Sequence, residues 1–197
     1  MQLNHNAPKT NVTAVMVEEH QLILRMIALL EKNVVLAEAG RFSDWSFFLD
    51  GALPFIKDFA DLFHHAKEED VLFKALVANG MPEQNSPVTA MLMEHDQGRS
   101  FVRGMGLAAR QLLTSDQAVT TTEAIAALAE NARGYVELLR DHIDKEDTIL
   151  YPLAERVLPE AVRSDMIAAY SAAEAKTSGL QEKYCRLVEV YEGKLDA

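Results

Sequence analysis

The residues of this chain that are best suited to chemistry are its histidines. Five of the six fall in four long segments that are rich in apolar residues, and these five are His20, His64, His65, His95 and His142. His64 and His142 each precede a glutamate, Glu68 or Glu146, by four residues. On a helix this spacing puts both side chains on one face, so that they reach a common point. Imidazole and carboxylate groups that converge in this way are typical metal ligands.

The residues around His142 indicate which face of the helix carries the pair. At about 100° per residue, His142 and Glu146 fall within an arc of apolar residues about 100° wide. The arc consists of Leu128, Tyr135, Leu139, His142, Glu146, Ile149, Leu150 and Leu153. Burying imidazole and carboxylate groups without partners costs on the order of several kcal/mol, so we expect them to bind each other, water or a metal ion.

The candidate ligands favour iron. They are imidazoles and carboxylates without a thiolate, which suits iron or manganese better than copper(I) or a structural zinc site. A glutamate can bridge two ions, and seven candidate ligands exceed what one zinc ion takes. The leading hypothesis is a site for two iron ions. Ferritin-like bundles use Glu-x-x-His, whereas this chain has His-x-x-x-Glu twice, which indicates a different family.

The elements that position these residues are predicted to be helices. Glycine and proline cluster between long segments that lack the alternating pattern of strands. Five helices are predicted. The first spans about 12–38, the third 87–114 and the fifth 160–191. The second begins at its N-cap, Ser43 or Asp44, and ends at about 78, and the fourth begins after Thr122 and ends at 157. Gly51 and Pro54 predict a kink in the second helix. Short connections favour antiparallel neighbours, so we predict an all-α, up-down-up-down four-helix bundle with an extra C-terminal helix.

This arrangement divides the chain into three parts. We expect a flexible N-terminus at 1–11, the bundle at 12–157 and a C-terminal helix packed on the bundle at 158–197. The C-terminal helix either covers an open end of the bundle or forms a homodimer contact, and no sequence feature decides between the two.

The composition excludes several classes of partner. The 30 acidic and 19 basic residues give a net charge of −11, which argues against nucleic acid and against an anionic membrane surface. No run approaches the roughly 18 to 20 apolar residues that a membrane-spanning helix requires. The N-terminal sequence lacks the apolar stretch of a secretory signal, and the single cysteine, Cys185, suits a reducing compartment. We therefore expect a cytoplasmic protein.

The same stretches of sequence resemble the hemerythrin-like, or HHE cation-binding, proteins. The matching stretches are Glu19-His20, HHAKEEDVLF from His64, MEHDQGR around His95 and HIDKEDTILYP from His142, in the family's order over about residues 12–157. The resemblance implies a four-helix bundle that holds two non-heme iron ions, bridged by oxide and carboxylate. Carrying the family's ligands over, residue by residue, gives His20, His64, Glu68, His95, His142 and Glu146.

The third helix departs from the pattern of the oxygen-carrying members. These have a His-x-x-x-His pair there, whereas Arg99 stands one turn after His95 in this chain, so that one imidazole is missing. Arg99 is either a group that supports the metal ligands from outside or a surface charge, and we favour the surface charge. His65 restores the count, because its position resembles that of a carboxylate ligand in the iron-sensing hemerythrin-like domain of a ubiquitin ligase subunit. The resemblance then implies five histidine and two glutamate ligands.

Two ligand assignments have open alternatives. In the second helix the apolar positions Phe55, Leu62, Ala66, Phe73 and Leu76 place His65 and Glu69 nearer the core, whereas alignment with HIDKEDTILYP favours His64 and Glu68. Glu69 therefore stays an alternative to Glu68. Asp147 stays a minor alternative to Glu146, because the oxygen carriers use an aspartate five residues after the histidine. If Asp147 is not a ligand, Asp144, Lys145 and Asp147 form a solvated helix face.

The resemblance implies two classes of function. The first is binding of O₂, or of NO or peroxide, at the iron pair, for oxygen or iron sensing. The second is a redox enzyme of the peroxidase, catalase-like or NO-reducing kind, including repair of iron centres. Such an enzyme would need an external reductant, because the sequence has no flavin, haem or dinucleotide motif. Iron storage and a metal-independent scaffold are the plainer alternatives.

Overall fold

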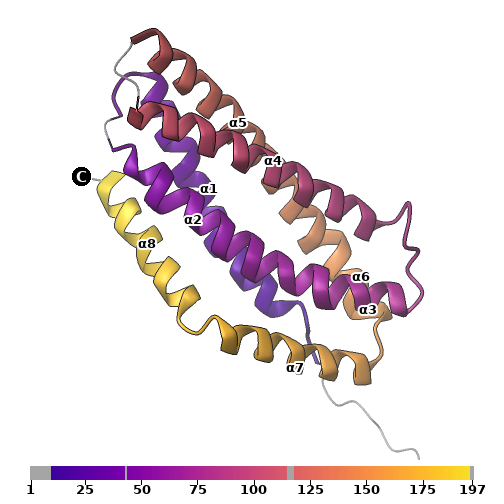
Figure 1. Ribbon diagram of the computed structural model, residues 1–197. Coiled ribbons are helices and arrows are strands. Elements are labelled where there is room, and N and C mark those ends of the chain that lie inside the picture. Colours follow the sequence, from indigo (N-terminus) through magenta and orange to yellow (C-terminus); the bar gives the residue numbers. More distant parts are fainter. Residues whose placement is uncertain (1–9, 43, 115–117, 196–197) are drawn as a thin grey trace, which may run out of the picture.

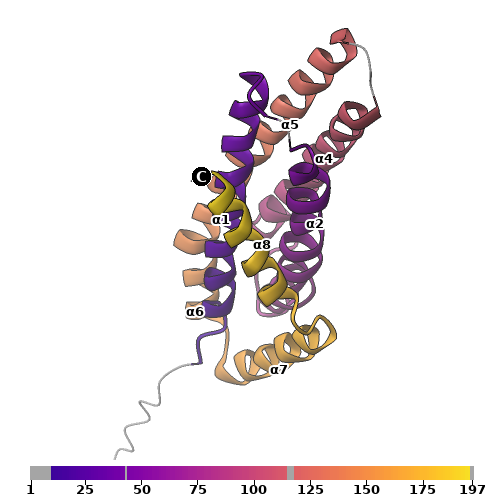
Figure 2. The same ribbon diagram turned by 90° about the vertical axis from the view of Figure 1, so that its left-hand side faces the viewer.

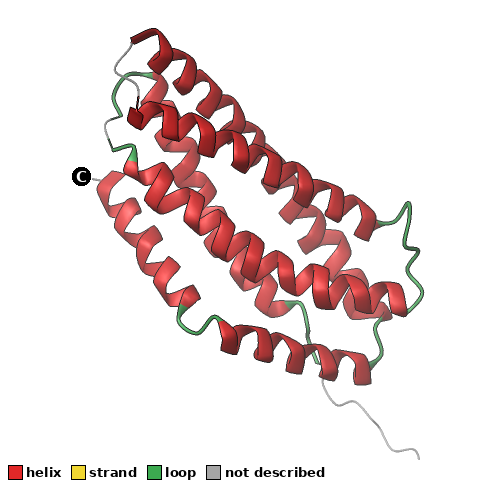
Figure 3. Cartoon of the chain, in the orientation of Figure 1, coloured by secondary structure: helices red, strands yellow, loops and turns green. Residues whose placement is uncertain are grey.

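The structure is a computed structural model that describes residues 10–42, 44–114 and 118–195. Within these residues every regular element is a helix and there is no strand (Figure 3), which confirms the all-α prediction. None of the helices in the same residues is long and apolar enough to span a membrane. Ser43 and most of the predicted N-terminal part lie outside the described residues.

Four helical segments lie side by side, and successive segments are joined at alternate ends (Figure 1). They are α1 (Ala14–Glu38), residues 47–78, α4 (Pro87–Thr114), and α5 (Ala118–Lys145), which continues through η4 (Glu146–Leu150) into α6 (Tyr151–Val157). This is the predicted up-down-up-down bundle. One boundary differs, because α5 begins at Ala118, before the threonines at 120–122 that were expected to precede it.

The second bundle helix, residues 47–78, combines α-helical and π-helical turns. It consists of η1 (Phe47–Ala52), α2 (Leu53–Phe55), η2 (Ile56–His65), η3 (Glu68–Leu72) and α3 (Phe73–Ala78), where η marks a π-helical stretch. The irregularity predicted at Gly51 and Pro54 is present as π-helical turns rather than as a break in the chain. Pro54 has no N–H to give to the preceding turn, which favours such an irregularity.

The π-helical turns change which side chains face the core. Their hydrogen bonds join residues five apart instead of four, so each such turn moves the following side chains around the helix axis. Leu62, in η2, is 71% exposed and Ile149, in η4, is 57% exposed, so both predicted core positions are wrong. Tyr151 and Ala154, which follow η4, are buried instead.

The interior consists of two apolar clusters with a polar layer between them. On α1, for example, Met16 belongs to one cluster and Ile23 to the other, and His20 lies between them in the sequence. On α4, His95 likewise lies between Met91 and Val102. The buried polar layer consists of Glu19, His20, His64, His65, Lys67, Glu68, His95, His142 and Glu146. All four bundle helices therefore contribute to one polar layer.

The predicted C-terminal helix is present in two parts. α7 (Glu160–Lys176) packs on the bundle through Met166 and Tyr170, and α8 (Leu180–Leu195) lies against α1 and η2 (Figure 2). Between them Gly179 has a φ of +79°, a left-handed conformation that glycine adopts without steric strain. This conformation interrupts the C-terminal helix, which the alanine-rich sequence predicted to be continuous over 160–191.

α4 and α5 approach each other closely at Gly134. A Cβ atom added there would lie 2.6 Å from the nearest ring carbon of Phe101 on α4, which is closer than two carbon atoms can pack. This close approach fixes the spacing of the two helices that carry His95 and His142.

Substitution of Gly134 by alanine tests this close approach. We expect Gly134→Ala to lower the free energy of unfolding by about 1–3 kcal/mol, because the methyl group displaces the Phe101 ring. Gly193→Ala on α8 is the matched control, since no atom lies within 4 Å of its added Cβ. Urea denaturation of both variants provides the measurement, and equal stabilities would contradict the predicted overlap.

Candidate metal centre

The seven residues singled out in the sequence meet inside the polar layer in two adjacent groups. The first group is His20, His64 and Glu146, and the second group is His65, Glu68, His95 and His142. In each group every residue offers a nitrogen or oxygen atom, and these atoms lie within 4.8 Å of one another. All seven side chains are buried. The structure therefore brings together every residue that the motifs selected.

Within each group two imidazoles face each other through their Nε2 atoms. The Nε2 atoms of His20 and His64 are 2.9 Å apart, and those of His95 and His142 are 3.1 Å apart. His65 lies parallel to the ring of His95, with the ring centres 3.7 Å apart. Three imidazoles thus gather in the second group and two in the first.

The remaining nitrogen of each facing imidazole, Nδ1, lies 2.7–2.9 Å from a carboxylate. The pairs are His20 with Asp147, His64 with Glu19, His95 with Glu69 and His142 with Glu94. An ionised carboxylate only accepts hydrogen bonds, so Nδ1 donates and the Nε2 atom of a neutral ring keeps its lone pair. Two lone pairs that face each other at about 3 Å need a proton or a cation between them, and carboxylates placed in this way orient histidines that bind metal.

Glu68 and Glu146 lie between the two groups. Glu146 has Oε2 3.3 Å from Nε2 of His20 and Oε1 3.1 Å from Nε2 of His142. For Glu68, the Oε2 atom is 3.4 Å from Nε2 of His95 and 3.9 Å from Nε2 of His64. Each glutamate therefore approaches imidazoles from both groups.

Several oxygens of these glutamates have no hydrogen-bond partner among the described residues. They are Oε2 of Glu68 and both carboxylate oxygens of Glu146. Nδ1 of His65 also has no hydrogen-bond partner among these residues. A buried carboxylate without a partner is costly, by roughly 1–3 kcal/mol or more per unsatisfied atom. A cation in each group would satisfy these atoms, so the residues present fit metal ions.

The pKa values of His20, His64 and His65 are consistent with this geometry. Burial lowers the pKa of His64 and of His65 to about 3, so both rings are neutral at neutral pH. Burial also opposes the charged form of His20, but the hydrogen bond to Asp147 and the nearby negative charge of Glu146 outweigh it and raise its pKa to about 9. In the metal-free protein, His20 therefore supplies the proton between the facing Nε2 atoms, and a metal ion would take the place of that proton.

The contacts of the centre repeat in the two halves of the chain. The dipeptide E-H occurs at 19–20 and 94–95, and the motif H-x-x-K-E-[E/D] occurs at 64–69 and 142–147. The glutamate of each dipeptide accepts from the histidine of the following motif and binds its lysine, Lys67 or Lys145. The last acidic residue of each motif accepts from the dipeptide histidine of the other half. The two halves thus orient each other's histidines.

The repeated contacts show where the two alternative ligands, Glu69 and Asp147, lie. Glu69 and Asp147 each lie against an Nδ1 atom and belong to neither group. Asp147 and Lys145 are thus not part of a simple solvated face. Both His64 and His65 are buried, because they end the π-helical stretch η2, so the conflict between periodicity and motif alignment disappears.

Sequence reasoning gave no role to three buried residues at the centre, Glu19, Lys67 and Tyr151. Tyr151 donates to Oε1 of Glu68 at 2.6 Å and stacks on the ring of His20. Lys67 binds Glu19, contacts Glu174 of α7 at 3.3 Å, and lies over the ring of Phe63. Comparison of the two H-x-x-K-E motifs could have identified Lys67, whereas the burial of Tyr151 depends on the π-helical turn before it.

Arg99 is not the isolated surface charge that we expected. Its guanidinium donates to Asp61 at 2.7 Å and to Glu69 at 2.8 Å, and its side chain is 32% exposed. Because Glu69 also accepts from His95, Arg99 is one contact away from the second group.

Comparison with known proteins gives one match. The model of the family described as hemerythrin HHE cation binding domain matches residues 11–154. The matched region contains both groups and leaves α7 and α8 outside. Searches of curated proteins and of solved structures found no match.

Metal binding should stabilise the fold. Ferrous iron added without oxygen to the metal-free protein is expected to raise the thermal unfolding midpoint, since a ligand at 100 times its Kd adds about 2.7 kcal/mol. Glu146→Gln removes the unpartnered carboxylate and should lose most of this increase. Differential scanning calorimetry measures both, and an equal increase in the wild type and Glu146→Gln would contradict the assignment.

The carboxylates on Nδ1 should matter for affinity. We expect Glu19→Gln to weaken binding of ferrous iron by roughly 10- to 100-fold, because His64 loses its charged acceptor. The matched control is Glu18→Gln, an exposed neighbour on α1 that should leave the affinity unchanged. Circular dichroism checks that Lys67, which also loses its partner, has not unfolded the protein, and Glu94→Gln repeats the test in the other half. Equal affinities in all variants would count against the role of these carboxylates.

Proposed function

The chain belongs to the hemerythrin HHE cation-binding domain family, and on this premise we propose that it binds two iron ions and takes O₂, or NO or peroxide, as a small ligand. The proposed ligands of one ion are His20, His64 and Glu146, and those of the other are His65, His95, His142 and Glu68. The observation that carries the proposal is the pair of unpartnered oxygens on Glu146, since one approaches His20 and the other approaches His142. Such a carboxylate is suited to bridging two ions.

The iron pair would supply redox chemistry and a coordination position for the small ligand. The chain supplies the environment. Each Nδ1–carboxylate contact holds an imidazole in one orientation and one tautomer. The hydroxyl of Tyr151 holds a proton beside Glu68 in a buried position. The apolar clusters on both sides of the polar layer exclude bulk water, which slows unwanted oxidation.

These features support reversible binding, and with it oxygen or iron sensing, as the primary function. We further propose that the protein acts in a reducing cytoplasm, where a chain with the single cysteine Cys185 needs no disulfide.

A redox enzyme is the second candidate, and one observation favours it. A pocket of about 250 Å³ reaches His65, His95 and His142 from outside the bundle. An open approach of this size lets a substrate such as peroxide reach the second group. Electrons would then come from an external reductant.

Metal analysis of natively purified protein tests the proposal. We expect two irons per chain and a visible absorption band that appears when the reduced protein meets air and disappears when O₂ is removed. Absence of metal, or one zinc per chain, would overturn it.

His142→Ala separates the two candidates. It should lose iron, whereas the exposed neighbouring change Asp144→Asn should keep both irons. Steady consumption of peroxide by the wild type that is lost in His142→Ala would favour the enzyme over the binding protein.

A further inference from the structure

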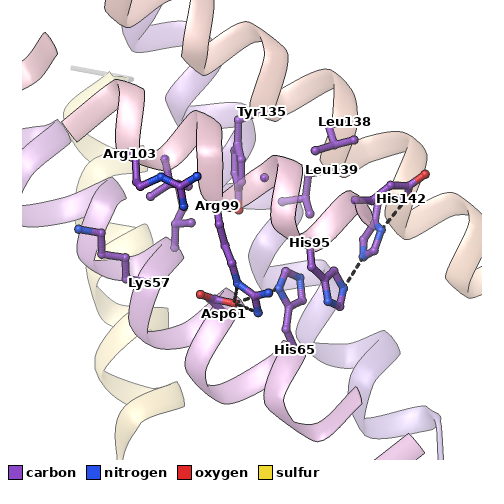
Figure 4. A pocket seen from close by; sticks show the side chains of 14 residues that line it. Lys57, Asp61, His65, His95, Arg99, Arg103, Tyr135, Leu138, Leu139 and His142 are labelled. Atoms are coloured by element: carbon purple, nitrogen blue, oxygen red, sulfur yellow. Dashed lines mark hydrogen bonds and ion pairs between the residues drawn. The ribbon is translucent and has the colours of Figure 1, made fainter. Parts of the chain in front are cut away.

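The pocket that reaches the second group is too large for a diatomic ligand alone. It lies between η2, α4 and α5, and His65, His95 and His142 form its inner end (Figure 4). Its volume of about 250 Å³ is several times the roughly 30 Å³ that one water molecule occupies in the liquid. The space therefore has room for a small organic molecule.

The wall of the pocket is mainly apolar. It is lined by Ile56, Gly98, Val102, Tyr135, Leu138 and Leu139. Ligand sites of this kind bury the apolar body of a small molecule and fix its orientation with a few polar groups.

The polar groups at the outer end are cations. Lys57 and Arg103 line the pocket at the end away from His142 (Figure 4). Neither has an ion pair or a side-chain hydrogen bond with any of the described residues. Arg99, in contrast, is already neutralised by Asp61 and Glu69. The two carboxylates that also line the pocket are paired, Asp61 with Arg99 and Glu94 with His142 and Lys145. Lys57 and Arg103 are thus the lining charges without a described partner, which favours an anionic ligand.

The hydroxyl of Tyr135 is available as a donor in the pocket. Tyr135 is 3% exposed and lines the pocket, and its OH group makes no hydrogen bond with any other residue that the structure describes. A ligand in the pocket can accept a hydrogen bond from it.

We propose that this pocket binds a small organic anion, a monocarboxylate with an apolar body. Lys57 and Arg103 attract the carboxylate, the Tyr135 hydroxyl donates to it, and the body lies along the apolar wall toward His95. The inference deepens the proposed function, because the body ends beside histidines that are proposed iron ligands. The groups that recognise the anion belong to neither group of candidate ligands.

Calorimetric titration of the natively purified protein with hexanoate tests the proposal. Hexan-1-ol and hexylammonium have the same body without the negative charge, and inorganic phosphate has the charge without the body. We expect saturable one-to-one binding of hexanoate, and binding at least about tenfold weaker for the other three. No binding of hexanoate, or equal binding of all four probes, would overturn the proposal.

Variants locate the binding site. The double variant Lys57→Ala, Arg103→Ala should bind hexanoate about tenfold more weakly, as the loss of two exposed ion pairs predicts. The double variant Lys32→Ala, Arg110→Ala removes the same charge from exposed positions outside the pocket and should bind as the wild type does. Equal affinities of the two double variants would contradict the site.

Two further variants act inside the pocket. Tyr135→Phe should weaken binding several-fold by removing the hydroxyl, at nearly constant shape. Gly98→Leu should abolish binding, because a Cβ at this position lies 3.5 Å from the Tyr135 ring and the longer side chain takes up pocket volume. Unchanged hexanoate affinity in both variants would overturn the proposal.

Iron content is measured on the same samples. Two irons per chain without hexanoate binding would refute this inference alone, whereas hexanoate binding without iron would refute only the proposed function.

Discussion

Nine polar side chains, among them three carboxylates and a lysine, are buried at one level of a four-helix bundle. Burial of so many ionisable groups without partners would outweigh the roughly 5–15 kcal/mol of net stability of a typical domain. The bundle meets this constraint by pairing. Glu19 binds Lys67, and each facing imidazole donates to a carboxylate. The atoms without a partner among the described residues are Oε2 of Glu68, both oxygens of Glu146 and Nδ1 of His65, and the three oxygens lie beside the two groups of imidazoles. The apolar clusters on either side then keep water away from the layer.

The helices reach this arrangement through their irregular turns. Two π-helical stretches begin at Glu68 and at Glu146, the two residues that lie between the groups. A π-helical turn is less favourable than an α-helical one and occurs mostly at functional sites. Here the turn after Glu146 moves Tyr151 into the core, where it binds Glu68, and turns Ile149 outward. The local helix geometry is thus part of the centre.

The sequence predicted the helices and the seven residues of the centre because both depend on spacing along one chain. Histidines on four amphipathic helices must meet when the apolar faces meet. The positions of Leu62 and Ile149 were wrong because ideal helical periodicity does not include π-helical turns. The break at Gly179 was missed although a glycine, the residue that adopts its left-handed conformation, marks it in the sequence. The partners of Arg99, and the contact of Lys67 with Glu174, were missed because they join distant segments of the chain.

The repeated motifs also make the differences between the two halves informative. Position 73 follows Glu68 by five residues, as position 151 follows Glu146, yet one is phenylalanine and the other tyrosine. Both rings stack on a histidine, Phe73 on His95 and Tyr151 on His20, but only Tyr151 has a hydroxyl to donate. In the same way His65 corresponds to Ile143. Each half therefore provides an internal reference for the other, and the non-matching positions mark where the surroundings of the two groups of histidines differ.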